Sequence, residues 1–260
     1  MMVNQSESAM HINPLILGGT TEATALCNAM HRAGLSGTVS LAGRVARPIR
    51  QPLPQRSGGF GGADGLARYI RDHGITHVID ATHPFAAQMS HNAVIASAQT
   101  GTPLIALTRA PWQATAQDNW THVPDINGAV AALNGPPERI FLAVGRMHLA
   151  EFVPNPQHFY LLRLIDAPDG PLPFTDHKIV LDRGPFTAEG DLALMRSHGI
   201  TRAVSKNSGG TGAQAKLLAA RTLGIPVIMI NRPALPSRHE AHDVATVLDW
   251  INHGKTDLGV

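Results

Sequence analysis

The sequence predicts an α/β protein in which mainly parallel strands are flanked by helices, and three observations lead to that class. Short apolar runs, each long enough for one buried strand, alternate along the chain with segments of helical length. Glycine closes several of the helical segments, as it commonly does at helix ends. The composition, 43% hydrophobic and 15% charged over 260 residues, is ordinary for a globular protein and leaves room for two such domains.

The first strand-to-helix turn is the leading candidate for a ligand site. Apolar residues 15–17 predict a buried strand, Gly18 and Gly19 follow it, and a helix is expected over residues 21–32. Paired glycines let a backbone approach a ligand closely, and the helix N-terminus favours an anion. The stretch lacks the G-x-G-x-x-G spacing and has Ala23 where a third small residue packs, so a tight turn without ligand stays open. Its place after the first strand favours the pyrophosphate of a dinucleotide.

The end of the second predicted strand, residues 38–42, bears on which dinucleotide would bind. In a doubly wound sheet this position faces the adenosine ribose, where an acidic residue bonds the 2′-hydroxyl of NAD. Here Gly43 and Arg44 follow the strand. Because arginine suits a 2′-phosphate, Arg44 favours NADP, with a solvated surface arginine as the alternative.

A third strand is expected over residues 77–81, and it ends in Thr82-His83-Pro84-Phe85. Proline suits the first turn of a helix, so Thr82 and His83 are predicted at the carboxyl end of a strand, directly before a helix. Open α/β sheets bind ligands at that edge. For His83, a packed or capping side chain is the alternative.

The domain boundary is predicted in the region 111–137, where tryptophan, asparagine, glycine and proline interrupt the alternating pattern. We therefore expect a disordered tail over residues 1–13, a first domain over residues 14–134 and a second domain over residues 135–260. Strands of the second domain are expected at residues 139–144, 158–165, 178–181, 202–204 and 226–230, with a final helix at 244–251. Thr187, followed by acidic residues, predicts a helix start.

A second anion site is predicted after the strand at residues 202–204. Lys206 can place a positive charge on a carboxylate, while the side chains of Ser205, Asn207 and Ser208 add hydrogen-bond donors. Lys206 precedes the glycines that begin at Gly209, unlike the lysine of a Walker loop, and a plain glycine-rich connector is the alternative. Three arginines are also predicted at strand ends in this half: Arg146, Arg183 and Arg232. Such a basic edge suits a polycarboxylate.

Several classes of protein are disfavoured by the composition. A formal charge of +2 is too small to favour nucleic acid or a membrane surface as partner. Residues 1–13 lack a signal pattern and no apolar run approaches the ~20 residues of a membrane span, so we expect a cytoplasmic protein. The single cysteine, Cys27, lies on an apolar helical stripe and is expected to be a buried thiol. No metal-ligand spacing is present, and the histidines at 239 and 242 are expected in a solvated linker.

Four motifs stand in order over nearly the whole chain. They are Gly-Gly-Thr-Thr-Glu-Ala at residues 18–23, Asp-Ala-Thr-His-Pro-Phe-Ala at 80–86, Ser-Lys-Asn-Ser-Gly-Gly at 205–210, and Pro-Val at 226–227 with Arg-Pro at 232–233. Together they resemble the precorrin-6A reductase (cobalt-precorrin-6A reductase) family of cobalamin biosynthesis. The region 111–137 and both tails carry no motif.

The resemblance implies two Rossmann-like domains with mainly parallel sheets flanked by helices and an active site in the cleft between them. It also implies an oxidoreductase that acts on a carbon–carbon double bond. NADPH would reduce precorrin-6A, or cobalt-precorrin-6A, to the dihydro product 6B by hydride transfer to the macrocycle. We expect a monomer or weak homodimer whose partner is this tetrapyrrole, without nucleic acid, membrane or metal.

By the same resemblance, residues of the matching motifs are expected at the two ligands, together with Arg44 and Arg183, which lie outside the motifs and are predicted from their positions at strand ends. For NADPH they are Gly18, Gly19, Thr20, Thr21, Glu22, Arg44, Thr82, Pro84 and Phe85. For the macrocycle they are Arg183, Ser205, Lys206, Asn207, Ser208 and Gly209. His83 is the candidate proton donor, with solvent as the alternative.

Two other functions stay open. A cofactor-free tetrapyrrole enzyme similar to uroporphyrinogen III synthase also has two α/β domains, but it has no use for Arg44 or for the turn at Gly18. A non-catalytic NADP-sensing module would bind the cofactor without turnover, and its second domain would not need an anion pocket.

Overall fold

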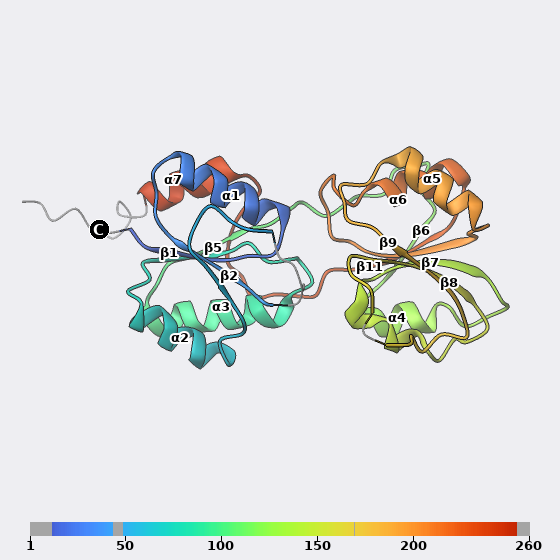
Figure 1. Cartoon of the computed structure of the whole chain (residues 1–260), viewed down its shortest axis with the longest axis horizontal. Coiled ribbons are helices and arrows are strands. Elements are labelled where there is room, and N and C mark those ends of the chain that lie inside the picture. The colour runs from blue at the N-terminus through green and yellow to red at the C-terminus, as the bar shows by residue number, and fades with distance from the viewer. Residues whose placement is uncertain (1–11, 44–48, 169, 254–260) are drawn as a thin grey trace, which may run out of the picture. The chain divides into compact units, whose positions relative to one another are not determined.

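The computed structural model describes residues 12–43, 49–168 and 170–253, which form two compact units (Figure 1). The first unit combines the described residues up to Thr108 with those from Leu235 onward, and the second runs from Arg109 to Ala234. Each unit is built on one six-stranded sheet with helices on both faces. All strand pairs in both sheets are parallel, so the predicted α/β class is confirmed.

The sheet of the first unit has the strand order β12-β5-β4-β1-β2-β3. Its strands are β1 (Pro14–Leu17), β2 (Thr38–Leu41), β3 (Gln55–Ser57), β4 (His77–Asp80), β5 (Leu104–Leu107) and β12 (His239–Ala241). Helices α1 (Thr21–Arg32) and α7 (Val244–His253) cover one face, and α2 (Gly62–Asp72) and α3 (Ala87–Thr100) cover the other (Figure 1).

The core of the first unit explains why α1 forms where the sequence predicts it. All of β1 is buried, as expected for a strand covered on both faces. The buried residues of α1 are Ala23, Leu26, Cys27 and Met30, which lie on one helical face. Full burial of a leucine or methionine contributes about 1.5–3 kcal/mol. Burial also raises the pKa of the Cys27 thiol to about 11, which confirms the predicted inert, buried cysteine.

The sheet of the second unit has the strand order β6-β11-β10-β7-β8-β9. Its strands are β6 (Trp120–Val123), β7 (Arg139–Ala143), β8 (Phe159–Leu164), β9 (Asp176–Leu181), β10 (Arg202–Lys206) and β11 (Val227–Ile230). Helices α5 (Ala188–Ser197) and α6 (Ala215–Leu223) pack on one face, and α4 (Ile126–Ala131) lies on the other (Figure 1). Two short 3-10 turns, Arg146–His148 and Ala150–Phe152, follow β7 in place of a helix.

Both sheets share one topology over five strands, and the sixth strand of each comes from outside that series. Five strands in each follow the order third, second, first, fourth, fifth, which is the doubly wound arrangement. The sixth strand of the first sheet, β12, is reached only after the chain has passed through the second unit. The sixth strand of the second sheet, β6, precedes that unit's own series.

The observed division therefore differs from the boundary expected between residues 134 and 135. Residues 109–134 join the second unit because β6 pairs with β11, and the C-terminal segment joins the first because β12 pairs with β5. The prediction of a solvated linker at residues 239–242 is wrong, since His239–Ala241 form β12. β6 and β12 are short edge strands with exposed positions, so neither carries an apolar run that a local pattern could reveal. Among the residues described, no helix is long and apolar enough to cross a membrane.

Candidate functional site

The turn after β1 needs its two glycines for different reasons. A Cβ on Gly18 would lie 3.0 Å from Cγ2 of Val39, so this position is tightly packed against β2. Gly19 has φ +117°, which a side chain disfavours, but it faces open space. The turn is thus packed on the side of the sheet and open on the side where a ligand would lie.

Thr20 connects this turn to the neighbouring strand. It is the N-cap of α1: its Oγ accepts a hydrogen bond from the Ala23 amide at 3.1 Å and donates one to the Ala81 carbonyl at 2.8 Å. The first amides of α1, including that of Thr21, have no acceptor inside the helix. Thr21 donates its hydroxyl hydrogen to Oε2 of Glu22 at 3.1 Å, which places a carboxylate in the first helical turn. The helix N-terminus can hold an anion, although Glu22 would repel one that came close to its side chain.

At the end of β4, a buried carboxylate organises the loop that was predicted to face a ligand. Asp80 is 2% exposed and accepts hydrogen bonds from Thr82, from Ser90 of α3 and from Arg238, which precedes β12. We call these four residues the Asp80 cluster. The sequence pattern indicated neither Ser90 nor Arg238. An aspartate ending an apolar strand was a signal for some buried partner, but nothing local pointed to Arg238.

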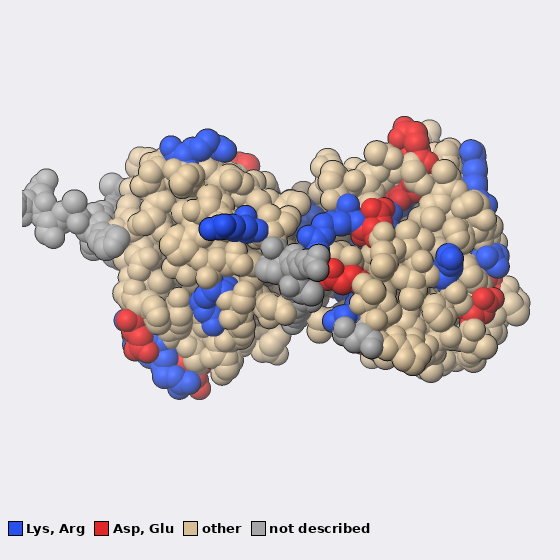
Figure 2. Space-filling view, viewed as in Figure 1, with Lys and Arg blue, Asp and Glu red and all other residues tan. Residues whose placement is uncertain are grey.

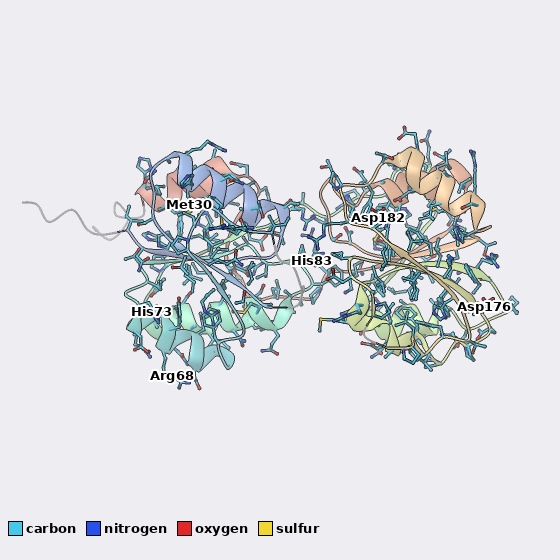
Figure 3. The ribbon with its side chains drawn as sticks, viewed as in Figure 1. Met30, Arg68, His73, His83, Asp176 and Asp182 are labelled. Atoms are coloured by element: carbon cyan, nitrogen blue, oxygen red, sulfur yellow. The ribbon has the colours of Figure 1, made fainter. Side chains whose placement is uncertain are left out.

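His83, Pro84 and Phe85 lie in the loop between β4 and α3. The helix begins at Ala87, later than the proline suggested. His83, labelled in Figure 3, is exposed, and its Nδ1 accepts a hydrogen bond from the Phe85 amide at 3.2 Å. That contact assigns the ring hydrogen of a neutral His83 to Nε2. Pro84 is buried and Phe85 half-buried.

At the adenosine edge, the expected Arg44 lies outside the described residues. A cation that the structure does describe there is Arg56 of β3, which no sequence motif indicated. Its Nη1 donates to Oγ of Ser40 at 2.6 Å and to the Gly58 carbonyl at 3.0 Å, and its guanidinium lies 4.0 Å from the ring centroid of Phe60. Arg56 thereby fixes the start of the loop at residues 58–61, which has the sequence Gly-Gly-Phe-Gly, beside the end of β2.

In the second unit, two of the predicted substrate residues build the loop after β10 from within. Ser205 is fully buried, and its Oγ donates to the Lys206 carbonyl at 3.2 Å. The Asn207 side chain is bonded to Trp112 at both ends: its Oδ1 accepts from the Trp112 amide at 2.7 Å, and its Nδ2 donates to the Trp112 carbonyl at 3.0 Å. Trp112 lies in the region where the sequence pattern was weakest. The hydrogen bonds of Ser205 and Asn207 therefore fix the loop from within.

Side-chain donors beneath this loop turn its carbonyl groups inward. Arg232 donates to the carbonyls of Asn207 at 2.9 Å and Ser208 at 3.1 Å, and Trp112 Nε1 donates to that of Gly210 at 2.8 Å. In a trans peptide the carbonyl and the following amide point in opposite directions, so the Gly209 and Thr211 amides point away from these donors. A Cβ on Gly209 would lie 2.2 Å from the Ala110 carbonyl oxygen, so only glycine fits.

Lys216, at the start of α6, is a buried cation behind this loop that the sequence pattern did not reveal. Its Nζ donates to the Ala213 carbonyl at 2.6 Å and lies 4.9 Å from a ring centroid of Trp112. Burial, and then the charge of Arg163, lower its pKa to about 7 against a favourable effect of Asp191, and Arg109 adds to the lowering. The back of the loop therefore carries more positive than negative charge.

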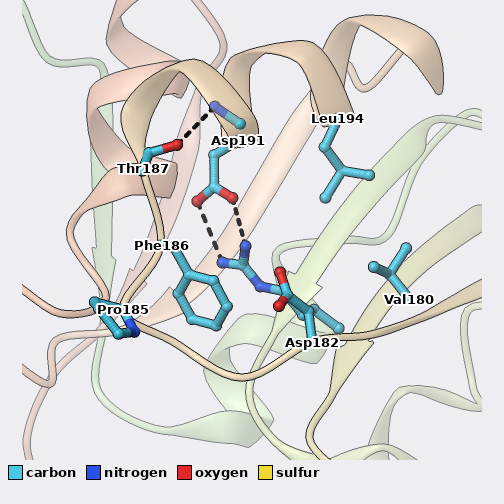
Figure 4. Close-up of a pocket in the computed structure, with 9 residues that line it drawn as sticks. Val180, Asp182, Pro185, Phe186, Thr187, Asp191 and Leu194 are labelled. Atoms are coloured by element: carbon cyan, nitrogen blue, oxygen red, sulfur yellow. Dashed lines mark hydrogen bonds and ion pairs between the residues drawn. The ribbon is translucent and has the colours of Figure 1, made fainter.

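A cavity of about 240 Å³ lies between α5 and the ends of β8 and β9 (Figure 4). The arginine that lines it is Arg163, which is paired through both nitrogens with Asp191 and stacks 3.5 Å from the ring centroid of Phe186. The predicted Arg183 is exposed outside this lining, and its amide donates to Oδ1 of Asp182 at 2.8 Å. Arg163 is thus neutralised within the protein, and Arg183 is the exposed cation at this strand end.

Charge and metal-binding capacity limit the chemistry. On the face shown in Figure 2, basic and acidic side chains are interspersed, in keeping with the formal charge of +2. Within residues 12–43, 49–168 and 170–253, no group of three or more histidine, cysteine, aspartate or glutamate side chains could hold a metal ion.

Two doubly wound sheets, one with a glycine turn at a helix N-terminus and one with a cation-backed glycine loop, define a two-domain α/β protein of the doubly wound class. Residues 14–252 match the family model described as precorrin-6x reductase CbiJ/CobK. The chain belongs to this family of oxidoreductases of cobalamin biosynthesis, as its motifs predicted.

Individual relatives agree with this membership. Precorrin-6A reductase of Rhodobacter capsulatus is 56% identical over 247 residues, which cover 95% of this chain and 98% of that protein. Cobalt-precorrin-6A reductase of Priestia megaterium is 32% identical over a region that covers 85% of this chain and 91% of that protein. A solved structure described as CobK precorrin-6A reductase is 56% identical, covers 96% of this chain and all of its own, and gives a TM-score of 0.90. The predicted family and fold class are therefore confirmed.

Proposed function

We propose that this chain reduces precorrin-6A with NADPH as the hydride donor. Family membership supports the reductase activity, and the observation that supports the cofactor is the open glycine turn above the N-terminus of α1. In this proposal the pyrophosphate lies over Gly18, Gly19, Thr20 and Thr21. The packed Gly18 and the positive φ of Gly19 fit a backbone that must pass close beneath a phosphate group.

The reduction transfers a hydride from NADPH to one carbon of a double bond of the macrocycle, and a proton goes to the neighbouring carbon. The cofactor supplies the hydride chemistry when bound, and the chain's own residues orient both reactants. We propose His83 as the proton donor, since it is an exposed histidine at the ligand edge of the first sheet, with solvent as the other source. Glu22, Pro84 and Phe85 complete the proposed cofactor contacts.

For the macrocycle, we propose Lys206, Ser208, Gly209 and Arg183 as contacts to its carboxylates. The outward amides beside Gly209 and the cations behind the loop favour carboxylate groups. Ser205 and Asn207 act in this proposal by holding the loop. The proposed binding thus assigns the cofactor to the first unit and the tetrapyrrole to the second.

We favour the cobalt-free substrate because of the pattern of identities. Five relatives named precorrin-6A reductase are 41–56% identical to this chain, whereas three named cobalt-precorrin-6A reductase are 26–32% identical. Comparing kcat/KM for precorrin-6A and for its cobalt complex tests this choice. A higher value for the cobalt complex would reverse it.

The first test follows the absorbance of NADPH in the presence of precorrin-6A, beside a matched run with NADH. Loss of absorbance that depends on the macrocycle and is faster with NADPH supports the proposal. Arg44→Ala should then weaken NADPH more than NADH by ~1–3 kcal/mol, because a charge-assisted contact to the 2′-phosphate is lost. Bound NADPH without oxidation would instead favour the NADP-sensing module, and no binding would favour the cofactor-free alternative.

A further inference from the structure

The carboxylate of Asp80 is saturated by four hydrogen-bond donors. Oδ1 accepts from the Thr82 amide at 3.1 Å and from the Thr82 hydroxyl at 2.6 Å. Oδ2 accepts from the Ser90 hydroxyl at 2.6 Å and from Nη1 of Arg238 at 2.5 Å. The Asp80 and Arg238 side chains are 1% and 7% exposed. Because an ionised carboxylate is an acceptor only, all four hydrogens must point at Asp80.

This arrangement decides what Thr82 can offer a ligand. Both of its hydrogens, on the amide and on the hydroxyl, are committed to Asp80. The lone pairs of Oγ remain, so the hydroxyl can accept a hydrogen bond but cannot donate one. A phosphate or carboxylate, which needs donors, is therefore disfavoured at Thr82, and a hydroxyl or amide N–H is favoured.

The strand order indicates which part of a dinucleotide would meet Thr82. β4 lies beside β1 on the side opposite β2, and the Thr20 hydroxyl links the β1 turn to Ala81. In doubly wound sheets the pyrophosphate lies over the first turn and the adenosine ribose over the end of β2. The nicotinamide half of a bound dinucleotide would therefore extend toward the end of β4. Its hydrogen-bond donors are the ribose hydroxyls and the carboxamide.

We propose that Oγ of Thr82 accepts a hydrogen bond from a donor on the nicotinamide-ribose half of NADPH, and that Arg238 is a positioning residue that holds Thr82 in this role through Asp80. This inference rests on the proposed use of NADPH. It gives the C-terminal segment before β12 a part in cofactor binding, although that segment follows the whole second unit in the chain.

The role of Arg238 follows from its two partners. Its Nη1 meets the buried Asp80, whereas its Nε bonds Glu240, whose side chain is 44% exposed. Losing Arg238 would leave a buried carboxylate without its counter-charge, and Thr82 and Ser90 would have to rearrange around it. Losing the charge of Glu240 would leave the Asp80 cluster intact. Glu240→Gln is therefore a matched control for Arg238→Met.

The test of Thr82 compares three probes that carry different parts of the cofactor. We expect Thr82→Val to weaken NADP⁺ binding about 5- to 20-fold, the loss for one hydrogen bond that leaves its partner unsatisfied. Binding of 2′,5′-ADP, which lacks the nicotinamide half, should not change, and Thr82→Ser should bind both probes as the wild type does. The third probe, the 3-acetylpyridine analogue of NADP⁺, lacks the amide hydrogens of the carboxamide. If Thr82→Val weakens the binding of this analogue, the donor is a ribose hydroxyl. If its binding is unchanged, the donor is the carboxamide.

Unchanged NADP⁺ affinity in Thr82→Val, or equal weakening of 2′,5′-ADP, would overturn the proposal for Thr82. These outcomes differ from failure of the proposed function, in which the wild type itself would neither bind NADP⁺ nor oxidise NADPH.

The test of Arg238 uses Met, Lys and the Glu240→Gln control. Arg238→Met should weaken NADP⁺ at least as much as Thr82→Val, Arg238→Lys should recover part of the affinity, and Glu240→Gln should bind as the wild type does. In Thr82→Val/Arg238→Met, the two losses should combine to less than their product, since both act through one contact. If Arg238→Met does not fold, Arg238→Lys carries the test, because its imperfect geometry should still raise the Kd of NADP⁺ and not that of 2′,5′-ADP. Wild-type affinity in a folded Arg238→Met, or losses that multiply fully, would overturn the positioning role.

Discussion

The two sheets have the same strand order but differ at the point where that order reverses. In the first unit, β1 leads through Gly18 and Gly19 into the twelve-residue α1, and the end of β4 presents Thr82 as an acceptor. In the second, β7 leads into short 3-10 turns, and the loop after β10 has its carbonyls held by Arg232, Trp112 and Lys216. One strand order thus carries two differently built loop edges, as expected when the loops and not the sheet determine which ligand binds.

The two units also differ in what holds their loops in place. In the first unit, Arg238 from the C-terminal segment pairs with Asp80 at the end of β4. In the second unit, Arg163 of β8 pairs with Asp191 of α5, which follows it closely in the chain. Each buried pair joins a strand, or the segment before one, to the edge where a ligand would bind. Breaking the pairs and loops separately shows whether the two units carry separate tasks.

The largest effect is expected at the buried pair of the second unit. Asp191→Ala leaves Arg163 buried without its carboxylate and should cost about 3–5 kcal/mol of the free energy of unfolding, measured by denaturant titration. Replacing both residues, as in Arg163→Met/Asp191→Leu, should cost less, because no charge is left unpaired. A double variant less stable than Asp191→Ala would refute this explanation.

The glycine loops give the next contrast. Gly209→Ala brings a Cβ against the Ala110 carbonyl at a residue with φ +69° and should cost about 2–4 kcal/mol, with a raised KM for the macrocycle. Gly19→Ala meets no atom within 4 Å, so only its backbone strain remains, about 1 kcal/mol, and its effect should fall on NADPH affinity. Equal effects of both variants on both ligands would contradict the division of tasks.

The lowered pKa of the buried Lys216 predicts a pH dependence of stability in the second unit. Its pKa is about 7 in the folded protein and 10.5 for an unperturbed lysine, so between these values the unfolded chain binds more protons and stability rises with pH. Below about pH 7 both states are protonated and the cost of the buried charge is fully present. The free energy of unfolding of the wild type, relative to Lys216→Met, should rise by about 2 kcal/mol from about pH 7 to about pH 9. A constant difference would show that Lys216 does not titrate in this range.

The smallest effects are expected at the two matched helix caps. Thr187 caps α5 through the Gly190 amide, and Thr20 caps α1 through the Ala23 amide. Replacement of either by alanine should lower stability by about 1 kcal/mol. Only Thr20→Ala should also weaken NADPH, because Thr20 links the turn to Ala81. A similar loss of NADPH affinity in Thr187→Ala would mean that the cofactor site is sensitive to any loss of stability.

The sequence by itself determined the elements and turns whose signals are local. The helix over residues 21–32, the cap at Thr187, the buried Cys27 and the strands with apolar runs agree with the structure. The glycine turn after β1 was also readable, because two glycines between an apolar run and a helix restrict the backbone over a few residues. Four ordered motifs then indicated the family, which the comparisons confirm.

Only the tertiary structure decided which segments complete each sheet and which side chains hold the loops. Arg238 meets Asp80 across 158 residues, and Asn207 meets Trp112 across 95. β6 and β12 are short edge strands whose pairing depends on a partner strand formed elsewhere in the chain. Periodicity reports how a segment faces its immediate surroundings, so it cannot specify a distant partner. For that reason, the sequence indicated at which strand ends a ligand is expected, whereas only the tertiary structure showed which distant residues hold those strand ends in position.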